Sequence, residues 1–172
     1  MTQSVVAMAG VAYDPDPWQN LYIALAGATA ALTGLLFVAV SINLKEILEG
    51  RLLPRRAAET LSIMVGLLVL SVFMLVPGQA DWILGVEILL IGLLEFAPIA
   101  GRLRMDRKPE DPAVWSFYPV ALLAAFALPV VVAGVSVLIG AGGGFYWLVA
   151  AIVFGLLAAV LNAWVLLVEI LR

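Results

Sequence analysis

The sequence predicts an all-α integral membrane protein, a small helical bundle with about five transmembrane helices. Of its 172 residues, 65% are hydrophobic and 12% are charged, whereas a soluble domain is roughly half apolar and about a quarter charged. The apolar residues form runs long enough to cross about 30 Å of hydrocarbon at about 1.5 Å per residue. Basic residues occur only between alternate runs, which is typical of a multi-pass membrane protein.

The chain divides into a short N-terminal segment, residues 1–19, and a single transmembrane domain, residues 20–172. The sequence Asp14-Pro15-Asp16-Pro17 predicts a non-helical lead-in to the first span. The predicted spans cover residues 20–43, 57–76, 82–100, 114–139 and 145–168.

Glycine and proline mark the connections and the kinks. Pro77 and Gly78 predict a tight turn after the second span, and the glycine run 140–144 predicts a flexible turn after the fourth. Pro98 and Pro129 lie inside predicted spans, where a missing N–H bends a helix.

The basic residues predict an N-terminus outside and a C-terminus in the cytoplasm. All nine fall on one side of the five-span topology, in two loops and at the C-terminus. The location expected from this pattern is the plasma membrane, specifically a bacterial inner membrane. Aromatic residues expected at the outer boundary are Trp18, Tyr22, Trp82, Tyr146 and Trp147.

Several function classes are disfavoured by composition. Cysteine and histidine are absent, which removes the usual ligands of zinc, iron–sulfur clusters and haem, so no cofactor or metal is expected. A net charge of −3 offers no basic face for nucleic acid. No recognisable nucleophile or metal set supports an enzyme, which is the least favoured function.

Two carboxylates inside the third span are the strongest functional signal. An ionisable side chain at a helix centre costs at least about 2.5 to 3.5 kcal/mol in hydrocarbon, so Glu87 and Glu95 predict a proton or cation pathway. At 100° per residue they lie about 80° apart and about 12 Å apart along the axis, as two stations on one broad face. The alternative is a protonated or paired glutamate that holds helices together, for example Glu95 with Asn162 or Arg102.

Weaker polar positions accompany them. Thr29, Thr33, Ser62 and Ser71 can each bond to a carbonyl of their own helix, so they are only candidate cavity lining. Asn162 is more costly to bury and is a candidate pathway residue or interhelical contact.

Small residues recur at helical spacing in two spans and predict close helix packing. The residues in these stripes are Gly27, Gly34 and Ser41 in the first span, and Ala151, Gly155, Ala159 and Ala163 in the fifth. Such stripes either assemble the monomer or join subunits of a homo-oligomer, and we expect a homo-oligomer.

The basic loops are candidate contacts for anionic lipid headgroups or a cytoplasmic partner, although such charge more often only sets topology. The residues concerned are Arg51, Arg55, Arg56, Arg102, Arg104, Arg107 and Lys108.

The function predicted from these features is a small oligomeric membrane channel or transporter for cations or protons. Glu87 and Glu95 would select the ion, and the small-residue stripes would provide the subunit contacts. The alternative is a non-catalytic membrane subunit or regulator that packs against a larger membrane complex.

Overall fold

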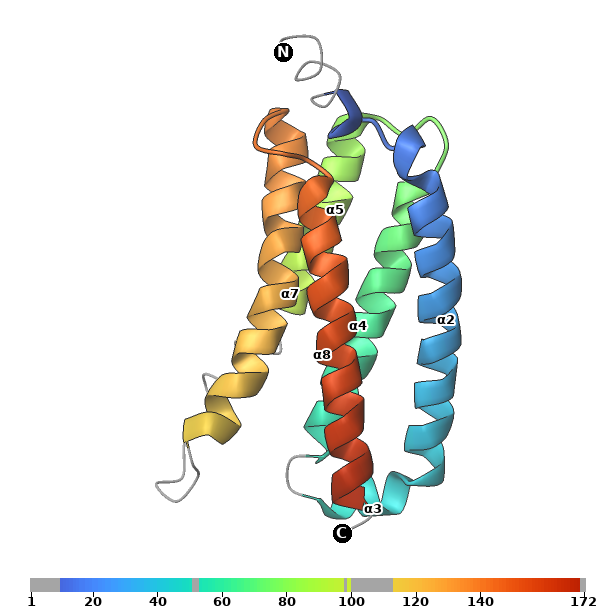
Figure 1. Ribbon diagram of the computed structural model, residues 1–172, viewed down its shortest axis with the longest axis vertical. Coiled ribbons are helices and arrows are strands. Elements are labelled where there is room, and N and C mark those ends of the chain that lie inside the picture. Colours follow the sequence, from blue (N-terminus) through green and yellow to red (C-terminus); the bar gives the residue numbers. More distant parts are fainter. Residues whose placement is uncertain (1–9, 51–52, 98, 100–112, 171–172) are drawn as a thin grey trace.

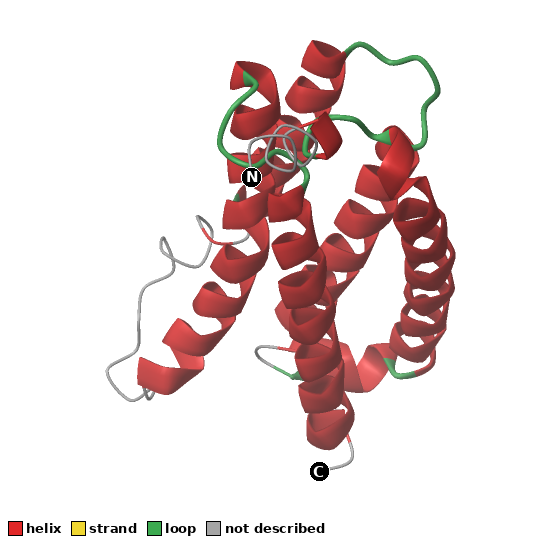
Figure 2. Ribbon diagram, turned by 45° about the horizontal axis from the view of Figure 1, so that its top comes forward, coloured by secondary structure: helices red, strands yellow, loops and turns green. Residues whose placement is uncertain are grey.

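The computed structural model describes residues 10–50, 53–97, 99 and 113–170, which form helices and turns and contain no strand (Figures 1 and 2). The helices are η1 (Asp16–Trp18), α2 (Gln19–Ile42), α3 (Leu44–Glu49), α4 (Leu53–Met74), α5 (Asp81–Glu95), α7 (Ala113–Ile139) and α8 (Tyr146–Ile170).

Four helical segments in the described residues are long and apolar enough to cross a membrane. They are Asp16–Ile42, Leu53–Met74, Val120–Ile139 and Tyr146–Leu166. Helix α5 is shorter, with 15 residues against the 19 expected for 82–100. Large apolar side chains are exposed on every one of these helices, for example Leu35, Val72, Leu94, Leu128 and Val160. A surface of this kind suits lipid rather than water, so the protein is a helical membrane bundle.

Successive long helices run in opposite directions, and α4 lies at the centre. In Figure 1, α2, α5 and α8 descend while α4 and α7 rise. Helix α4 packs against α2, α5 and α8, and α7 packs against α5 and α8. We call the end that carries η1 and the α4–α5 and α7–α8 turns the N-terminal end. The opposite end, which carries α3 and the last turn of α8, is the C-terminal end.

Helices α5 and α7 approach each other so closely that glycine is required at the contact. A Cβ added at Gly134 of α7 would lie 2.6 Å from the backbone N of Leu89, and one at Gly92 of α5 would lie 2.8 Å from the backbone N of Val131. An added Cβ at Gly85, seven residues before Gly92, would instead lie 2.9 Å from the Leu138 side chain. Small residues allow such backbone contact between membrane helices.

The glycine turn between α7 and α8, which we expected to be flexible, has hydrogen bonds to the end of α7. Ser136 Oγ donates a hydrogen bond to the Ala141 carbonyl and accepts one from Gly144 N at 2.8 Å. Four glycines of the turn have positive φ angles, from +51° to +108°, which glycine adopts without strain.

The N-terminal segment packs onto this turn. Phe145 N donates to the Ala12 carbonyl at 2.8 Å, and Gly143 N donates to the Tyr13 hydroxyl at 3.0 Å. A side chain at Gly144 would collide with the Ala12 carbonyl. The ring of Trp18 meets Tyr146 edge to face, with centroids 5.0 Å apart. Asp14 and Pro15 of the expected lead-in are non-helical, whereas Asp16 and Pro17 belong to η1, because proline is well suited to the first turn of a helix.

Helix α2 lies at the edge of the bundle. Only 11% of the residues in its apolar segment are buried, against 50% for α4. Its buried face includes Tyr22, which we expected at the membrane boundary and whose side chain is fully buried against the bundle. The helix ends where Asn43 turns its amide back to the Ala39 carbonyl at 2.9 Å, and α3 then follows in a new direction.

Of the two predicted kinks, only the one at Pro129 lies in the described residues. Helix α7 remains helical through Pro129, which is buried, and its N-terminal half, drawn in yellow, leans away from α8 (Figure 1). Pro98 lies outside the described residues.

The glycine contact can be tested with two matched substitutions. We expect Gly134→Ala to lower the thermal midpoint, because overpacking against backbone costs about 1 to 3 kcal/mol. Gly27→Ala serves as the control, since no atom lies within 4 Å of its added Cβ, and it should be neutral or slightly stabilising. Thermal unfolding in mild detergent measures both, and equal midpoints for the two variants would contradict the predicted contact.

Candidate functional site

The Glu95 carboxyl is buried between α5 and α4. The residue is 5% exposed, and Ser62 Oγ of α4 lies 3.2 Å from its Oε1 and 3.1 Å from its Oε2. Gly66, one turn after Ser62, provides the space, because an added Cβ there would lie 2.5 Å from Oε1. One hydroxyl and one glycine of α4 therefore form the cradle of this carboxyl.

This cradle does not balance a negative charge. A serine hydroxyl has one proton, so it donates to only one of the two carboxylate oxygens at a time. No described basic side chain forms an ion pair with Glu95. Burying an ionised carboxylate without a counter-charge is very costly. Glu95 is therefore suited to hold a proton, or to bind a cation that supplies the missing charge.

Glu87 lies toward the N-terminal end and has a different partner. Its side chain is half-buried, and Gln79 Nε2, from the α4–α5 turn, donates a hydrogen bond to its Oε2. The other amide atom of Gln79, Oε1, is buried and has no hydrogen-bond partner among the described residues. An amide, and not a hydroxyl, therefore faces this second carboxyl.

Two isoleucines lie between the two glutamates in the sequence of α5. Ile88 is fully buried and Ile91 is 7% exposed, both in the core of the bundle. The structure thus gives the two stations separate surroundings, with Glu95 against the middle of α4 and Glu87 against the turn that follows it.

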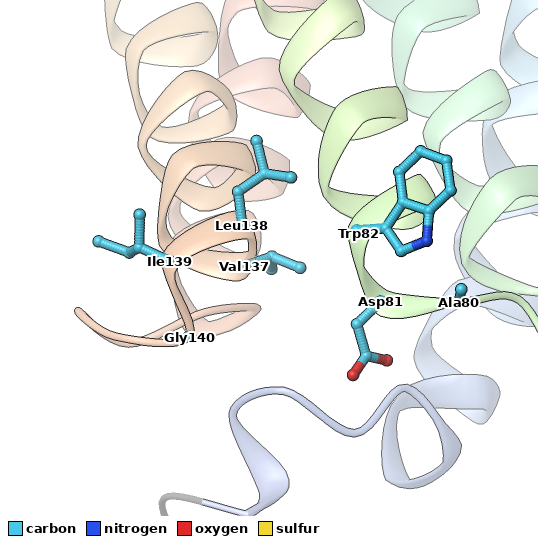
Figure 3. A pocket seen from close by; sticks show the side chains of 7 residues that line it. All are labelled: Ala80, Asp81, Trp82, Val137, Leu138, Ile139 and Gly140. Atoms are coloured by element: carbon cyan, nitrogen blue, oxygen red, sulfur yellow. The ribbon is translucent and has the colours of Figure 1, made fainter.

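An open hollow lies beside the Gln79 turn. It has a volume of about 650 Å³ and lies between the start of α5 and the end of α7 (Figure 3). Asp81 and Trp82 line it from α5, opposite the apolar residues Val137, Leu138 and Ile139 of α7. Asp81 is its one charged lining residue.

The other polar residues largely bond within their own helices. Thr29 donates to the Leu25 carbonyl at 2.7 Å. Thr33 and Ser71 also donate to the carbonyl four residues earlier in their own helices. Ser62, which we grouped with them, instead reaches across to Glu95. Asn162 is 2% exposed on α8, and no hydrogen bond joins it to Glu95 in the described part of the chain.

The two small-residue stripes have opposite surroundings. On α8, Ala151, Gly155 and Ala159 are buried, Ala163 is half-buried, and Gly155 faces Phe126 of α7. On α2, Gly27, Gly34 and Ser41 are all exposed. The α8 stripe therefore packs within the monomer, and the α2 stripe faces outward.

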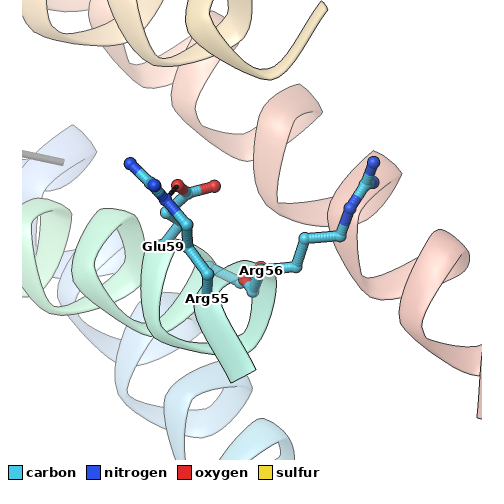
Figure 4. Close-up of polar contacts among 4 residues, drawn as sticks. Arg55, Arg56 and Glu59 are labelled. Atoms are coloured by element: carbon cyan, nitrogen blue, oxygen red, sulfur yellow. Dashed lines mark hydrogen bonds and ion pairs between the residues drawn. The ribbon is translucent and has the colours of Figure 1, made fainter. Parts of the chain in front are cut away.

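Two of the basic residues turn inward at the C-terminal end. Arg55 Nε pairs with Glu59 Oε1 at 3.0 Å, and Glu59 is almost completely buried (Figure 4). Arg56 is 7% exposed, and its side chain extends from α4 toward α8. Arg55 is thus half-buried beside Glu59, and Arg56 is buried; contact with lipid headgroups stays a prediction. The remaining loop residues, Arg51, Arg102, Arg104, Arg107 and Lys108, lie outside the described residues.

Sequence reasoning missed Gln79 and Gly66. Gln79 follows Pro77 and Gly78 and precedes Glu87 by eight residues, so a polar side chain at a span boundary was the available signal. Gly66 lies four residues after Ser62, as a small pair on one helix face. Neither signal identifies the glutamate that it serves.

Comparison with known proteins finds no match to this chain among protein families, curated proteins or solved structures.

The contact between Gly66 and Glu95 can be tested with a double-mutant cycle. We expect Gly66→Ala to destabilise the protein because its Cβ displaces the carboxyl, and to be harmless when combined with Glu95→Ala. The coupling should be about 0.5 to 3 kcal/mol, as for residues in contact. Unfolding in detergent measures all four proteins, and purely additive effects would show that the side chains do not touch.

Proposed function

We propose that this protein is a small oligomeric membrane transport protein for protons or monovalent cations, with Glu95 as its central binding group. The observation that supports this function is the burial of the Glu95 carboxyl with one hydroxyl donor and no described basic partner. Such a carboxyl gains or loses a positive charge within the bundle, which is what a transport site requires.

The proposal includes five crossings with the N-terminal end outside. Five helices of alternating direction put η1 and the last turn of α8 at opposite ends (Figure 1). The basic residues Lys45, Arg55 and Arg56 lie at the C-terminal end, as the positive-inside rule requires of a cytoplasmic face. Helix α5 is short for a full crossing, and its two neighbours α4 and α7 cover it on both sides.

Transport through a shared path requires more than one subunit. Within one chain, Glu87 and Glu95 have separate partners, and the buried residues Ile88 and Ile91 lie between them in the sequence. The exposed α2 face, with Gly27 and Gly34, is the surface that we assign to contact with a second copy, since small residues promote association in lipid.

The exposed face of α2 also supports the alternative of a non-catalytic membrane subunit. In that case the partner on α2 is a different membrane protein, and Glu95 serves only to fasten α5 to α4. The two functions differ in whether the purified chain moves ions by itself.

Ion flux tests the central role of Glu95. We expect Glu95→Gln to reduce cation or proton flux into proteoliposomes about tenfold or more, because a neutral amide does not exchange a charge as a carboxyl does. Glu49→Gln, the same change at an exposed residue of α3, should leave flux unchanged. Equal flux through wild type and Glu95→Gln would remove the transport function.

Cysteine crosslinking tests the α2 contact, because the natural chain contains no cysteine. We expect Gly34→Cys to form a disulfide-linked homodimer in membranes under mild oxidation. Val160→Cys, equally exposed to lipid on α8, should remain monomeric. A dimer band of the same intensity from both variants would contradict a specific α2 contact.

A further inference from the structure

A second site is indicated where the α4–α5 turn meets α5. The Gln79 side chain folds from this turn onto Glu87, and its Nε2 donates to Glu87 Oε2. Its Oε1 is then left as a buried acceptor with no partner in the described residues. A buried amide oxygen without a partner costs roughly 1 to 3 kcal/mol, so its presence beside a carboxylate calls for a ligand.

The charge of this end selects a positive ligand. Asp14, Asp16 and Asp81 are exposed at the N-terminal end. No lysine or arginine occurs in residues 1–44 or 57–101, which include η1, α2, the α4–α5 turn and α5. This end of the bundle therefore attracts cations and repels anions. The open hollow lined by Ala80, Asp81 and Trp82 adjoins the turn and offers an approach from the same side.

The ligand set fits a single positive charge. One carboxylate and one amide oxygen are hard oxygen ligands, with one formal negative charge between them. In the described residues no group of three or more acidic side chains is placed to hold a metal ion. A divalent cation usually has more carboxylate ligands than this, so an alkali-type monovalent cation is the better match.

We propose that Gln79 Oε1 and the Glu87 carboxylate are the protein ligands of a monovalent cation site at the N-terminal end of the bundle. In this arrangement Gln79 Nε2 keeps its hydrogen bond to Glu87 Oε2, and the unpartnered Oε1 is the amide atom that turns to the ion. This inference rests on the proposed transport function and gives it an entry site, distinct from Glu95.

Binding of rubidium to the purified protein tests the site without requiring transport. The thermal midpoint is measured as rubidium chloride replaces N-methylglucamine chloride at constant ionic strength. We expect a saturable rise in the midpoint for wild type, as for any ligand that binds the folded state. Gln79→Leu and Glu87→Gln should weaken the apparent affinity about tenfold, which corresponds to about 1.4 kcal/mol. Gln19→Leu, at an exposed glutamine of α2, is the matched control and should behave as wild type.

The variant Gln79→Glu distinguishes two roles of Gln79, as a ligand of the cation or only as a hydrogen-bond donor to Glu87. This variant keeps an oxygen but loses the NH₂ donor, so a ligand role predicts that rubidium stabilises it at least as strongly as wild type. If the amide serves only as a donor to Glu87, Gln79→Glu and Gln79→Leu should lose stability alike, with no change in rubidium affinity. That result overturns the site.

Two further results contradict the inference without touching the transport function. If the thermal midpoint of the wild type does not change with rubidium but rises on acidification, the ligand is a proton. A rubidium effect that remains equal in Gln79→Leu and wild type places the ion elsewhere. If instead Glu95→Gln leaves flux intact while the rubidium effect depends on Gln79, the transport function fails and the cation site stands.

Discussion

The contact between α5 and α7 determines how the rest of the bundle is arranged. Gly92 and Gly134 bring the two backbones close together, and Gly85 makes room for the side chain of Leu138. Because one side of α5 is thus occupied by α7, its remaining buried side faces α4, and Glu95 meets Ser62 and Gly66 there. Leu93 and Leu94 are left on the exposed side. A contact that involves no polar side chain therefore orients the buried carboxyl.

The two glutamates of α5 differ in their burial and in their hydrogen-bond partners. Glu95 has a hydroxyl from the centre of the bundle and almost no exposure, so its charge state is controlled from within the protein. Glu87 is half-buried and faces an amide from a turn, so it remains accessible from its own end. The two carboxyls on one helix thus have different surroundings, one internal and one peripheral.

Most of the fold could be predicted from the long apolar runs. Most of the site could not, because the sequence does not determine how each helix is oriented about its own axis. The helices α2, α4, α7 and α8 follow the predicted spans closely, since hydrocarbon thickness sets their length. The position of Glu87 and Glu95 on one apolar helix was predictable in the same way. Their partners Gln79 and Ser62 were not, because a side chain's neighbours depend on how each helix is turned. Tyr22 shows the same limit, since its depth suited a boundary residue but its face is buried against the bundle.

The N-terminal segment has a consequence for biogenesis. Its Ala12 carbonyl and Tyr13 hydroxyl bond to Phe145 and Gly143, more than a hundred residues later in the chain. During synthesis these partners emerge from the ribosome after all the helices but α8, so the segment has nothing to bind until the last hairpin is inserted. Its docking is then a closing step that joins the first and last parts of the chain, and an extension that blocks it should leave the bundle inserted but unfinished.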